Sequence, residues 1–240
     1  MAPMANRDKH LGMTSAPIRL GNGRRPTVRL QTRPLERLMR YYRYVSEQHS
    51  PGACENLPRP RTRHVTSAEI AAALDVDPTQ VRKDFGAIGL VGLGRVGYDV
   101  CEVVRTIRAL LRFDRSYEAV LVGTGHLGGA LLAYRGFAVY GLRVAAAFDN
   151  DPRKIGRKVA GYPVKPMRAL APFLRTHPVP LAILAVPAPA AQPVADRLVA
   201  GGVQAIWNYS PVTLAVPPRV LVRDEHMSLG LAVIANRLKR

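Results

Sequence analysis

Three glycines have the spacing needed to hold the pyrophosphate of a dinucleotide. Gly123, Gly125 and Gly128 follow an apolar strand predicted for residues 119–122, and a helix predicted for residues 129–134 comes directly after them. In such a loop the first glycine allows a tight turn, the second lets the backbone approach the phosphates, and the third lets the helix pack on the strand. The amides at the start of that helix also favour an anion.

A carboxylate stands where the adenosine ribose of that dinucleotide would lie. A second predicted strand, over residues 142–148, ends at Asp149, which is 24 residues after Gly125. This is close to the spacing at which an acid accepts hydrogen bonds from the ribose hydroxyls. An acid there also disfavours a 2′-phosphate, so the pattern predicts NAD(H) rather than NADP(H). The alternative is a Rossmann-like unit that is structural and binds no ligand.

A second glycine motif, Gly92-x-Gly94-x-x-Gly97, is a formal match that we reject as a cofactor loop. A phosphate loop must leave a strand and enter a helix. Here the preceding segment is itself rich in glycine and follows a predicted helix directly. A glycine-rich β-hairpin fits better, and we expect the wing of a winged helix.

Residues 66–85 have the pattern of a helix-turn-helix. Thr66 and Glu69 form a capping box at the start of one helix, and Asp77 caps a second helix that runs to Phe85. One face of the second helix is apolar, and another carries Thr79, Arg82 and Lys83. A recognition helix needs this arrangement, because its apolar groups pack on the core of the domain while cations and hydroxyls reach DNA. The alternative is a solvated charged face.

The remaining elements complete an α/β fold class, with an N-terminal winged helix-turn-helix and a C-terminal Rossmann domain built on a doubly wound parallel sheet. Helices are expected from Leu35 to about Gln48 and from Tyr98 to Leu111, and later at 191–200 and 227–238; strands are expected at 181–186, 203–207 and 220–222. The carboxyl ends of parallel strands form the ligand crevice. We therefore place these residues beside the dinucleotide: Val186, Pro187, Ala188, Asn208, Tyr209, Ser210 and Pro211.

Composition allows two modest domains and excludes several classes of protein. No run approaches the ~20 apolar residues of a membrane span, and residues 1–14 do not resemble a secretory signal. The two cysteines, Cys54 and Cys101, have no metal-binding spacing; we expect no metal and two reduced thiols in a cytoplasmic protein. The net charge of +18 suits a nucleic-acid partner, but it is spread along the chain, and a general basic bias explains much of it.

An enzyme would need an acid or base placed beside the reacting end of the cofactor. His126 lies inside the phosphate loop, at the wrong end of the cofactor, and His177 and His226 have no acidic or basic partner at a suggestive spacing. There is also no second domain for a substrate. We therefore expect binding without turnover.

Taken together, motifs from both halves of the chain resemble, in order, those of the Rex family of redox-sensing transcriptional repressors. The resemblance covers about residues 34–240, on these segments: 37–44, 66–69, 80–84, 96–99, 123–128, 148–152, 154–156, 186–188 and 208–211. It implies a homodimer that exchanges its C-terminal helix. It also implies NADH and NAD⁺ competing for one site, with NADH releasing operator DNA. The expected segments are a disordered basic tail (1–33), a winged-helix DNA-binding domain (34–112), an NAD(H)-binding Rossmann domain (113–222) and a dimerisation helix (223–240).

The resemblance also implies roles for individual residues. Added to the cofactor set are Thr124, His126, Leu127, Asp151 and Lys154. The expected DNA-binding residues are Arg37, Thr66, Ser67, Thr79, Gln80, Arg82, Lys83 and Arg95. In Rex relatives a tyrosine matching Tyr134 and an arginine matching Arg43 pair in turn with an aspartate, which His226 replaces here. Two outcomes stay open: Asp224 or Glu225 takes over that role, which we favour, or the coupling is weaker and depends on pH.

Two other departures weaken parts of this comparison. The family wing usually carries a basic pair, where this chain has Leu93 and Gly94 before Arg95, and the family glutamate and glutamine of the last helix are Gly230 and Ala232. Two further hypotheses stay open: an NAD-dependent oxidoreductase fused to a DNA-binding module, and a regulator that binds CoA or another nucleotide on the same fold.

Overall fold

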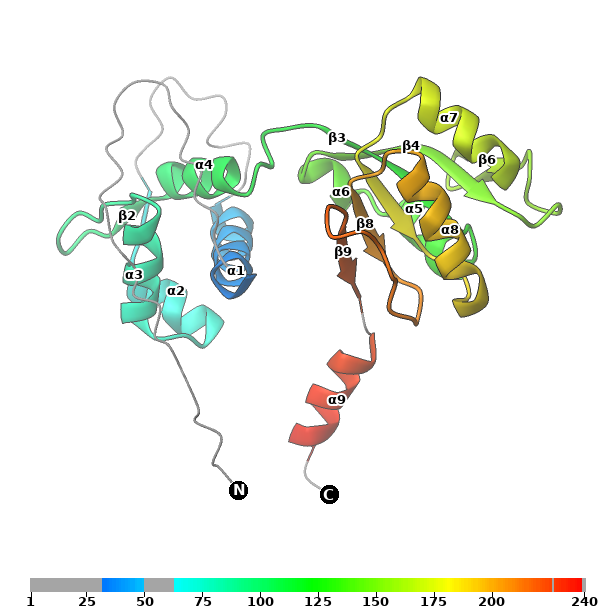
Figure 1. Cartoon of the computed structure of the whole chain (residues 1–240). Coiled ribbons are helices and arrows are strands. Elements are labelled where there is room, and N and C mark those ends of the chain that lie inside the picture. Colours follow the sequence, from blue (N-terminus) through cyan, green and yellow to red (C-terminus); the bar gives the residue numbers. More distant parts are fainter. Residues whose placement is uncertain (1–31, 50–62, 226, 239–240) are drawn as a thin grey trace, which may run out of the picture. The chain divides into compact units, whose positions relative to one another are not determined.

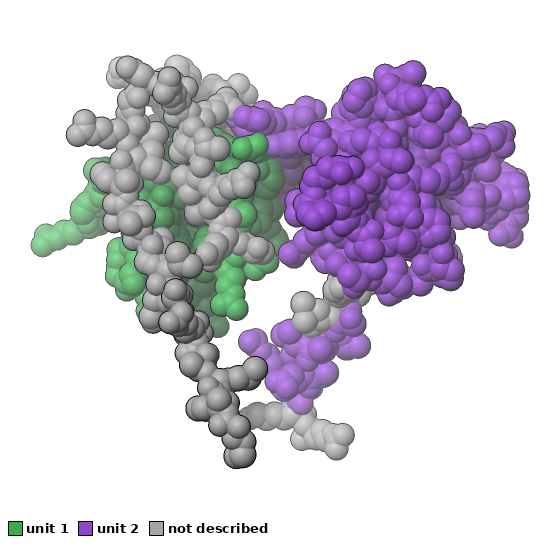
Figure 2. Space-filling view, viewed as in Figure 1, with its two compact units in different colours: residues 1–113 green, residues 114–240 purple. Residues whose placement is uncertain are grey.

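The structure is a computed structural model that describes residues 32–49, 63–225 and 227–238. The chain divides into two compact units, residues 1–113 and 114–240, which Figure 2 colours green and purple. The expected tail at 1–33 lies outside the described residues except for its last two, which begin the first helix. His226 also lies outside the described residues.

The first unit is a small helical domain with a two-stranded sheet, as the predicted winged helix-turn-helix requires. Its described elements are α1 (Thr32–His49), β1 (His64–Val65), α2 (Ser67–Leu74), α3 (Pro78–Ala87), β2 (Tyr98–Asp99) and α4 (Val100–Leu110) (Figure 1).

Side-chain caps fix where the two helices of the helix-turn-helix begin. Thr66 Oγ1 accepts from the Glu69 amide at 3.1 Å, and Glu69 Oε2 accepts from the Thr66 amide at 2.6 Å. At the start of α3, Asp77 Oδ1 accepts from the amides of Thr79 and Gln80. These bonds satisfy amides that a helix start otherwise leaves without partners. Both caps predicted from the sequence are confirmed.

Aromatic rings hold α3 against its neighbours. Phe85 is fully buried, and its ring meets Tyr41 of α1 and Tyr98 of β2 edge to face, with centroids 5.7 and 4.8 Å apart. Such pairs add to the free energy gained by burial alone. Buried aliphatic residues complete this core: Leu38, Val45, Ile70, Val81, Val103 and Ile107. One side of α3 is therefore fixed in the core, while its other side faces solvent.

The segment after α3 forms a wing and not a cofactor loop. A bridge between Leu93 and Gly97 closes its turn, and β2 then pairs antiparallel with β1. Because Tyr98 and Asp99 belong to β2, the following helix begins at Val100, two residues later than the sequence predicts.

The second unit is built on a twisted sheet with helices on both faces. Its described elements are β3 (Tyr117–Val122), α5 (His126–Ala133), α6 (Gly136–Val139), β4 (Leu142–Asp149), β5 (Lys158–Val159), β6 (Tyr162–Pro166), a 3₁₀ turn (Met167–Ala169), α7 (Leu170–Thr176), β7 (Leu181–Leu184), α8 (Ala188–Ala200), β8 (Ala205–Asn208), β9 (Leu221–Asp224) and α9 (Met227–Arg237).

The strand order is β5-β6-β4-β3-β7-β8-β9, and every pair except β5 with β6 is parallel. Without β5, this is the order of a Rossmann fold, with β3 as the first strand. Successive residues of β3 point to opposite faces: Val120 and Val122 pack with α7 and α8, while Ala119 and Leu121 pack with α5 and α6 (Figure 1). The predicted fold class is confirmed.

Several elements between residues 136 and 176 are absent from the sequence prediction. They are α6, β5, β6, the 3₁₀ turn and α7, and most are too short to show a hydrophobic period. The β5–β6 hairpin turns through Ala160 and Gly161, both at positive φ. Elsewhere the differences lie at element ends: α5 begins at His126 and α8 at Ala188, each three residues earlier than predicted.

Two further observations bear on the composition. Within the described residues no helix is long and apolar enough to cross a membrane. Cys101 takes part in a disulfide, so the prediction of a free thiol is wrong for this residue; Cys54 lies outside the described residues.

We predict that Gly97→Ala destabilises the wing. Gly97 has a φ of +106°, and an added Cβ would lie 2.6 Å from the carbonyl oxygen of Val65. Both the strained φ and this collision cost free energy, about 1–3 kcal/mol for the backbone alone. Amide hydrogen exchange over residues 63–110 should rise in this variant. Gly94→Ala is the control, because nothing lies within 4 Å of its added Cβ; equal exchange in both variants would contradict the prediction.

Candidate functional site

The three glycines of the loop between β3 and α5 differ in what surrounds them. Gly123 turns the chain with a φ of +95°, and an added Cβ would meet the carbonyl of Ala185 at 2.3 Å. A Cβ on Gly128 would lie 1.8 Å from the carbonyl oxygen of Gly123, so only glycine allows α5 to begin this close to β3. Nothing lies within 4 Å of a Cβ on Gly125, whose backbone faces open space. The loop therefore has one glycine left free to receive a ligand.

The carboxylate of Asp149 ties this loop to the end of β4. Asp149 Oδ2 accepts from the amide and the hydroxyl of Thr124, both at 2.8 Å, and from Lys154 Nζ at 3.0 Å. Asp149 Oδ1 accepts from the amide of Asp151 at 2.9 Å. The structure thus brings together four residues of the predicted cofactor set. Asp151 itself pairs with exposed Arg153.

These bonds keep Asp149 ionised. Burial opposes the charge, but the hydrogen bonds from Asp151, Thr124 and Lys154 outweigh it and lower the pKa of Asp149 to about 2. A lowered pKa stabilises the fold above the ordinary value of about 3.9, and that contribution is lost as the pH falls toward 2. Since Oδ2 already has three donors, Oδ1 is the oxygen with room for a ribose hydroxyl.

The other predicted cofactor segments lie at the same edge of the sheet. β4, β3, β7 and β8 are consecutive parallel neighbours, so the residues after each of them gather along one edge. Asn208 is buried: its amide nitrogen donates to Val212 O and Asp224 Oδ1, and its oxygen accepts from the Ser210 amide. Ser210 is 2% exposed, and its hydroxyl has no hydrogen-bond partner among the described residues. A buried hydroxyl in this state favours a ligand at the site.

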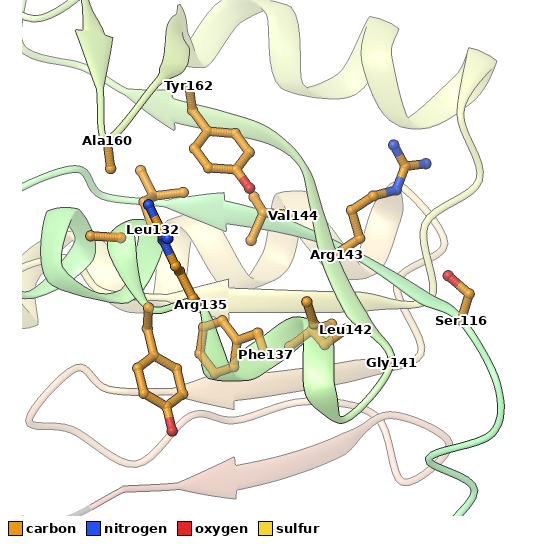
Figure 3. Close-up of a pocket in the computed structure, with 13 residues that line it drawn as sticks. Ser116, Leu132, Arg135, Phe137, Gly141, Leu142, Arg143, Val144, Ala160 and Tyr162 are labelled. Carbon is orange, nitrogen blue, oxygen red and sulfur yellow. The ribbon is translucent and has the colours of Figure 1, made fainter. Parts of the chain in front are cut away.

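A cavity of about 780 Å³ lies elsewhere, where α5 ends and β4 begins. Figure 3 shows the rings of Phe137 and Tyr162 and the guanidinium of Arg135 around it. Because α5 runs back from the glycine loop, this is the opposite end of the helix from the predicted crevice. Tyr134, one of the predicted switch residues, lines this cavity, and its ring stacks edge to face on Phe137.

In the first unit, part of the predicted DNA-binding set forms one surface. Arg82 of α3 donates to Thr79 Oγ1 at 3.0 Å and to Ser67 Oγ of α2 at 3.3 Å. Lys83 is exposed beside it. Arg95 stands on the wing at a φ of +62°. We call Ser67, Thr79, Arg82 and Lys83 the α3 face; it joins hydroxyls and cations, which is the chemistry that phosphates and base edges bind.

Two other residues predicted to bind DNA are engaged inside the domain. Arg37 donates to Asp84 through both Nε and Nη2, each at 2.7 Å, and Gln80 Nε2 donates to Asp84 Oδ1 at 2.8 Å. Tyr41 donates to the same carboxylate at 3.0 Å. Sequence reasoning missed Asp84 and Tyr41. The available signal was an acid four residues after Gln80, on the flank of α3 next to its apolar face.

Two of the predicted switch residues, Arg43 and Tyr134, belong to different units, and the third, His226, lies outside the described residues. Arg43 is exposed and pairs with Glu47 on its own helix. The two acids expected to replace the family aspartate already have partners: Asp224 accepts from Asn208, and Glu225 accepts from Trp207 Nε1 at 3.0 Å. No group of three His, Cys, Asp or Glu side chains suited to a metal occurs in the described residues.

Comparison with known proteins assigns the chain to a family. The family model described as putative DNA-binding protein N-terminus matches residues 33–86, and that described as CoA binding domain matches residues 114–212. The redox-sensing transcriptional repressor Rex of Carboxydothermus hydrogenoformans is 40% identical over 206 residues, covering 86% of this chain and 95% of that protein. The Rex of Streptomyces avermitilis is 44% identical over 171 residues, or 71% and 68% of the two chains.

Comparison with solved structures indicates the same family. RSP, a Rex-family repressor, is 30% identical in its complex with β-NAD⁺ and operator DNA, with a TM-score of 0.77 over 88% of this chain and 93% of that one. Its complex with β-NADH is 29% identical, with a TM-score of 0.74 over 88% and 94%. The chain belongs to the Rex family of redox-sensing transcriptional repressors.

Proposed function

We propose that this chain is a transcriptional repressor that binds operator DNA with its first unit and is released when NADH occupies its second. One observation carries the proposal: a single chain joins a glycine loop open to a pyrophosphate at Gly125 to the exposed α3 face. The similarity to RSP, solved with NAD⁺ and operator DNA and with NADH, supports both halves. The dinucleotide acts as a signal here and is not turned over, so the chain is not an enzyme.

The residues present fit a dinucleotide. Gly125 leaves room for the pyrophosphate against the first amides of α5, which are not capped by a side chain. Asp149 lies on the adenosine side of the loop, and the hydroxyl of Ser210 offers an unused donor and acceptor. His126 and Leu127 begin α5 directly after this loop, and the segment from Val186 to Ala188 follows the neighbouring strand β7. When bound, NADH and NAD⁺ differ in the charge and shape of one ring, which is the difference that a switch must sense.

The DNA contacts of this proposal come from the α3 face, with Thr66 and Arg95 at its margins. Arg82 is held in place by Ser67 and Thr79 before DNA arrives, so less side-chain entropy is lost on binding. The cytoplasm is the compartment that this function requires.

A dimer completes the proposed switch. Helix α9 has apolar side chains that are half or more exposed, among them Leu231, Val233 and Ile234, and Leu238 directly after the helix is exposed too. A second copy of the chain, exchanging α9, would bury them. Movement between the two copies would then bring Arg43 and Tyr134 to the start of α9, where His226 stands. Takeover by Asp224 or Glu225 requires each to give up or share its bond with Asn208 or Trp207.

A second candidate function comes from the match to a CoA binding domain. In that case the crevice would hold CoA or another nucleotide and would not distinguish NADH from NAD⁺. The same fold accommodates both ligands, so the fold alone does not decide.

Operator binding with and without ligands tests the proposal. Duplexes are first enriched from a random library by the full-length protein with NAD⁺, and their affinity is then measured with NADH, NADPH and CoA added. We expect NADH to weaken binding by about tenfold or more, and NADPH and CoA to have little effect. If CoA changes operator affinity and NADH does not, the result favours the second candidate.

Removing the cations of the α3 face should abolish this DNA binding. Arg82→Ala with Lys83→Ala is expected to weaken operator affinity more than about tenfold. The slope of log affinity against log salt should flatten by about 0.9 for each phosphate that the protein no longer neutralises, while NADH affinity stays unchanged. The control, Arg157→Ala with Lys158→Ala, removes the same charge from exposed sites of the second unit. Equal losses in both double variants would mean that only net charge matters.

Asp149→Ala should narrow the preference for NADH over NADPH. The change removes the carboxylate and frees Lys154, whose cation then favours a 2′-phosphate. Fluorescence titration of both dinucleotides measures the ratio of their affinities. Asp196→Ala is the control, because Asp196 is an exposed acid of α8 outside the predicted cofactor set. If the ratio of NADH to NADPH affinity in Asp149→Ala equals that of the wild type, the role of Asp149 is structural only.

A further inference from the structure

The buried carboxylate of Asp84 accepts four hydrogen bonds, three of which join α1 to α3. Arg37 and Tyr41 reach it from α1, and Gln80 reaches it from the preceding turn of α3. The side chain of Asp84 is 9% exposed, and that of Arg37 is 27% exposed. A buried acid with a bidentate arginine and two further donors is a satisfied charge cluster.

The groups of this cluster keep their ionisation states near neutral pH. Burial alone would raise the pKa of Asp84, but the hydrogen bonds from Arg37, Tyr41 and Gln80 lower it below its usual value. Burial and the bond to Asp84 raise the pKa of Tyr41 to about 12. The cluster therefore keeps one negative charge, one positive charge and a neutral phenol across the physiological pH range.

The apolar contacts of α3 do not by themselves fix its rotation. Val81 and Phe85 are fully buried, but burial is not directional, and a helix can turn slightly about its axis while its apolar residues stay covered. Bidentate bonds are directional. Because Asp84 directly follows Arg82 and Lys83 in the chain, the angle at which α1 holds Asp84 also sets the direction of the α3 face.

We propose that Asp84 is the positioning residue of the DNA-reading helix, and that Arg37 and Gln80 act on DNA binding through Asp84 rather than by touching DNA. This inference rests on the proposed function, since it assumes that α3 reads the operator. It assigns Arg37 and Gln80 roles different from those expected from the sequence. In Arg37, Nε and Nη2 form one of the two edges through which a guanidinium binds an anion bidentately, and this edge already binds Asp84.

The salt dependence of operator binding separates positioning from contact. Arg37→Ala in the full-length protein should weaken operator affinity about tenfold or more, with the slope of log affinity against log salt unchanged. Arg82→Ala, which removes a predicted phosphate or base contact, should flatten that slope by about 0.9. A slope that flattens equally in Arg37→Ala would overturn the proposal, because it would show Arg37 on a phosphate.

A triple variant separates positioning from stability. Arg37→Met with Tyr41→Phe and Asp84→Leu replaces the charge cluster by apolar groups of similar size and leaves no buried phenol without a partner. Proteins often tolerate such a replacement without loss of stability. We expect its thermal unfolding to match the wild type and its operator affinity to fall about tenfold or more. Wild-type affinity in this variant would overturn the proposal, since apolar docking alone would then suffice.

Amide hydrogen exchange keeps the test independent of the operator. In Asp84→Asn, exchange in α3 should rise, while exchange in the second unit stays as in the wild type. If the wild-type protein binds no operator, the proposed function fails, but the exchange measurement still decides the role of Asp84. Unchanged exchange in α3 would overturn it.

Discussion

The second unit depends on the approach of one backbone to another, at the contact between Gly128 and the carbonyl of Gly123. A methyl group at Gly128 would sit 1.8 Å from that oxygen. Because glycine carries no such group, α5 can start within a few residues of the end of β3, and its first turn directly follows the glycine loop. The parallel sheet places the ends of β4, β7 and β8 along the same edge. The glycines thus fix how closely α5 approaches β3, and the strand order fixes which segments follow along that edge.

Each unit contains one buried carboxylate that holds a functional segment in place. Asp149 holds the phosphate loop through Thr124 and the strand end through Lys154, and Asp84 holds α3 through Arg37 and Tyr41. In both cases apolar burial brings the segments together, and the directional bonds of the acid set their orientation. The surfaces proposed to bind ligand and DNA lie next to these anchors and are themselves exposed.

Local signals made much of this structure predictable. The capping box at Thr66, the cap at Asp77 and the strand–glycine–helix pattern around Gly125 act over a few residues, so the sequence shows them directly. Residues 136–176 gave no such signal: β5 and β6 are short and are defined by pairing with distant strands. The pairing of Arg37 with a buried acid could not be predicted for the same reason, because it is a contact between distant parts of the chain. Its partner Asp84 is 47 residues away, and an arginine near a DNA-reading helix looks the same in sequence whether it faces a phosphate or a buried acid.

The low pKa of Asp149, about 2, has a consequence for signalling. A site built on a group that is half-titrated near neutral pH would respond to pH as well as to its ligand. Asp149 stays fully charged between pH 5 and 8, about three or more units above its midpoint. Tyr41, with a pKa of about 12, stays neutral over the same range. Asp149 and Tyr41 therefore keep their charge states when the pH changes within this range, and the hydrogen bonds that they make persist.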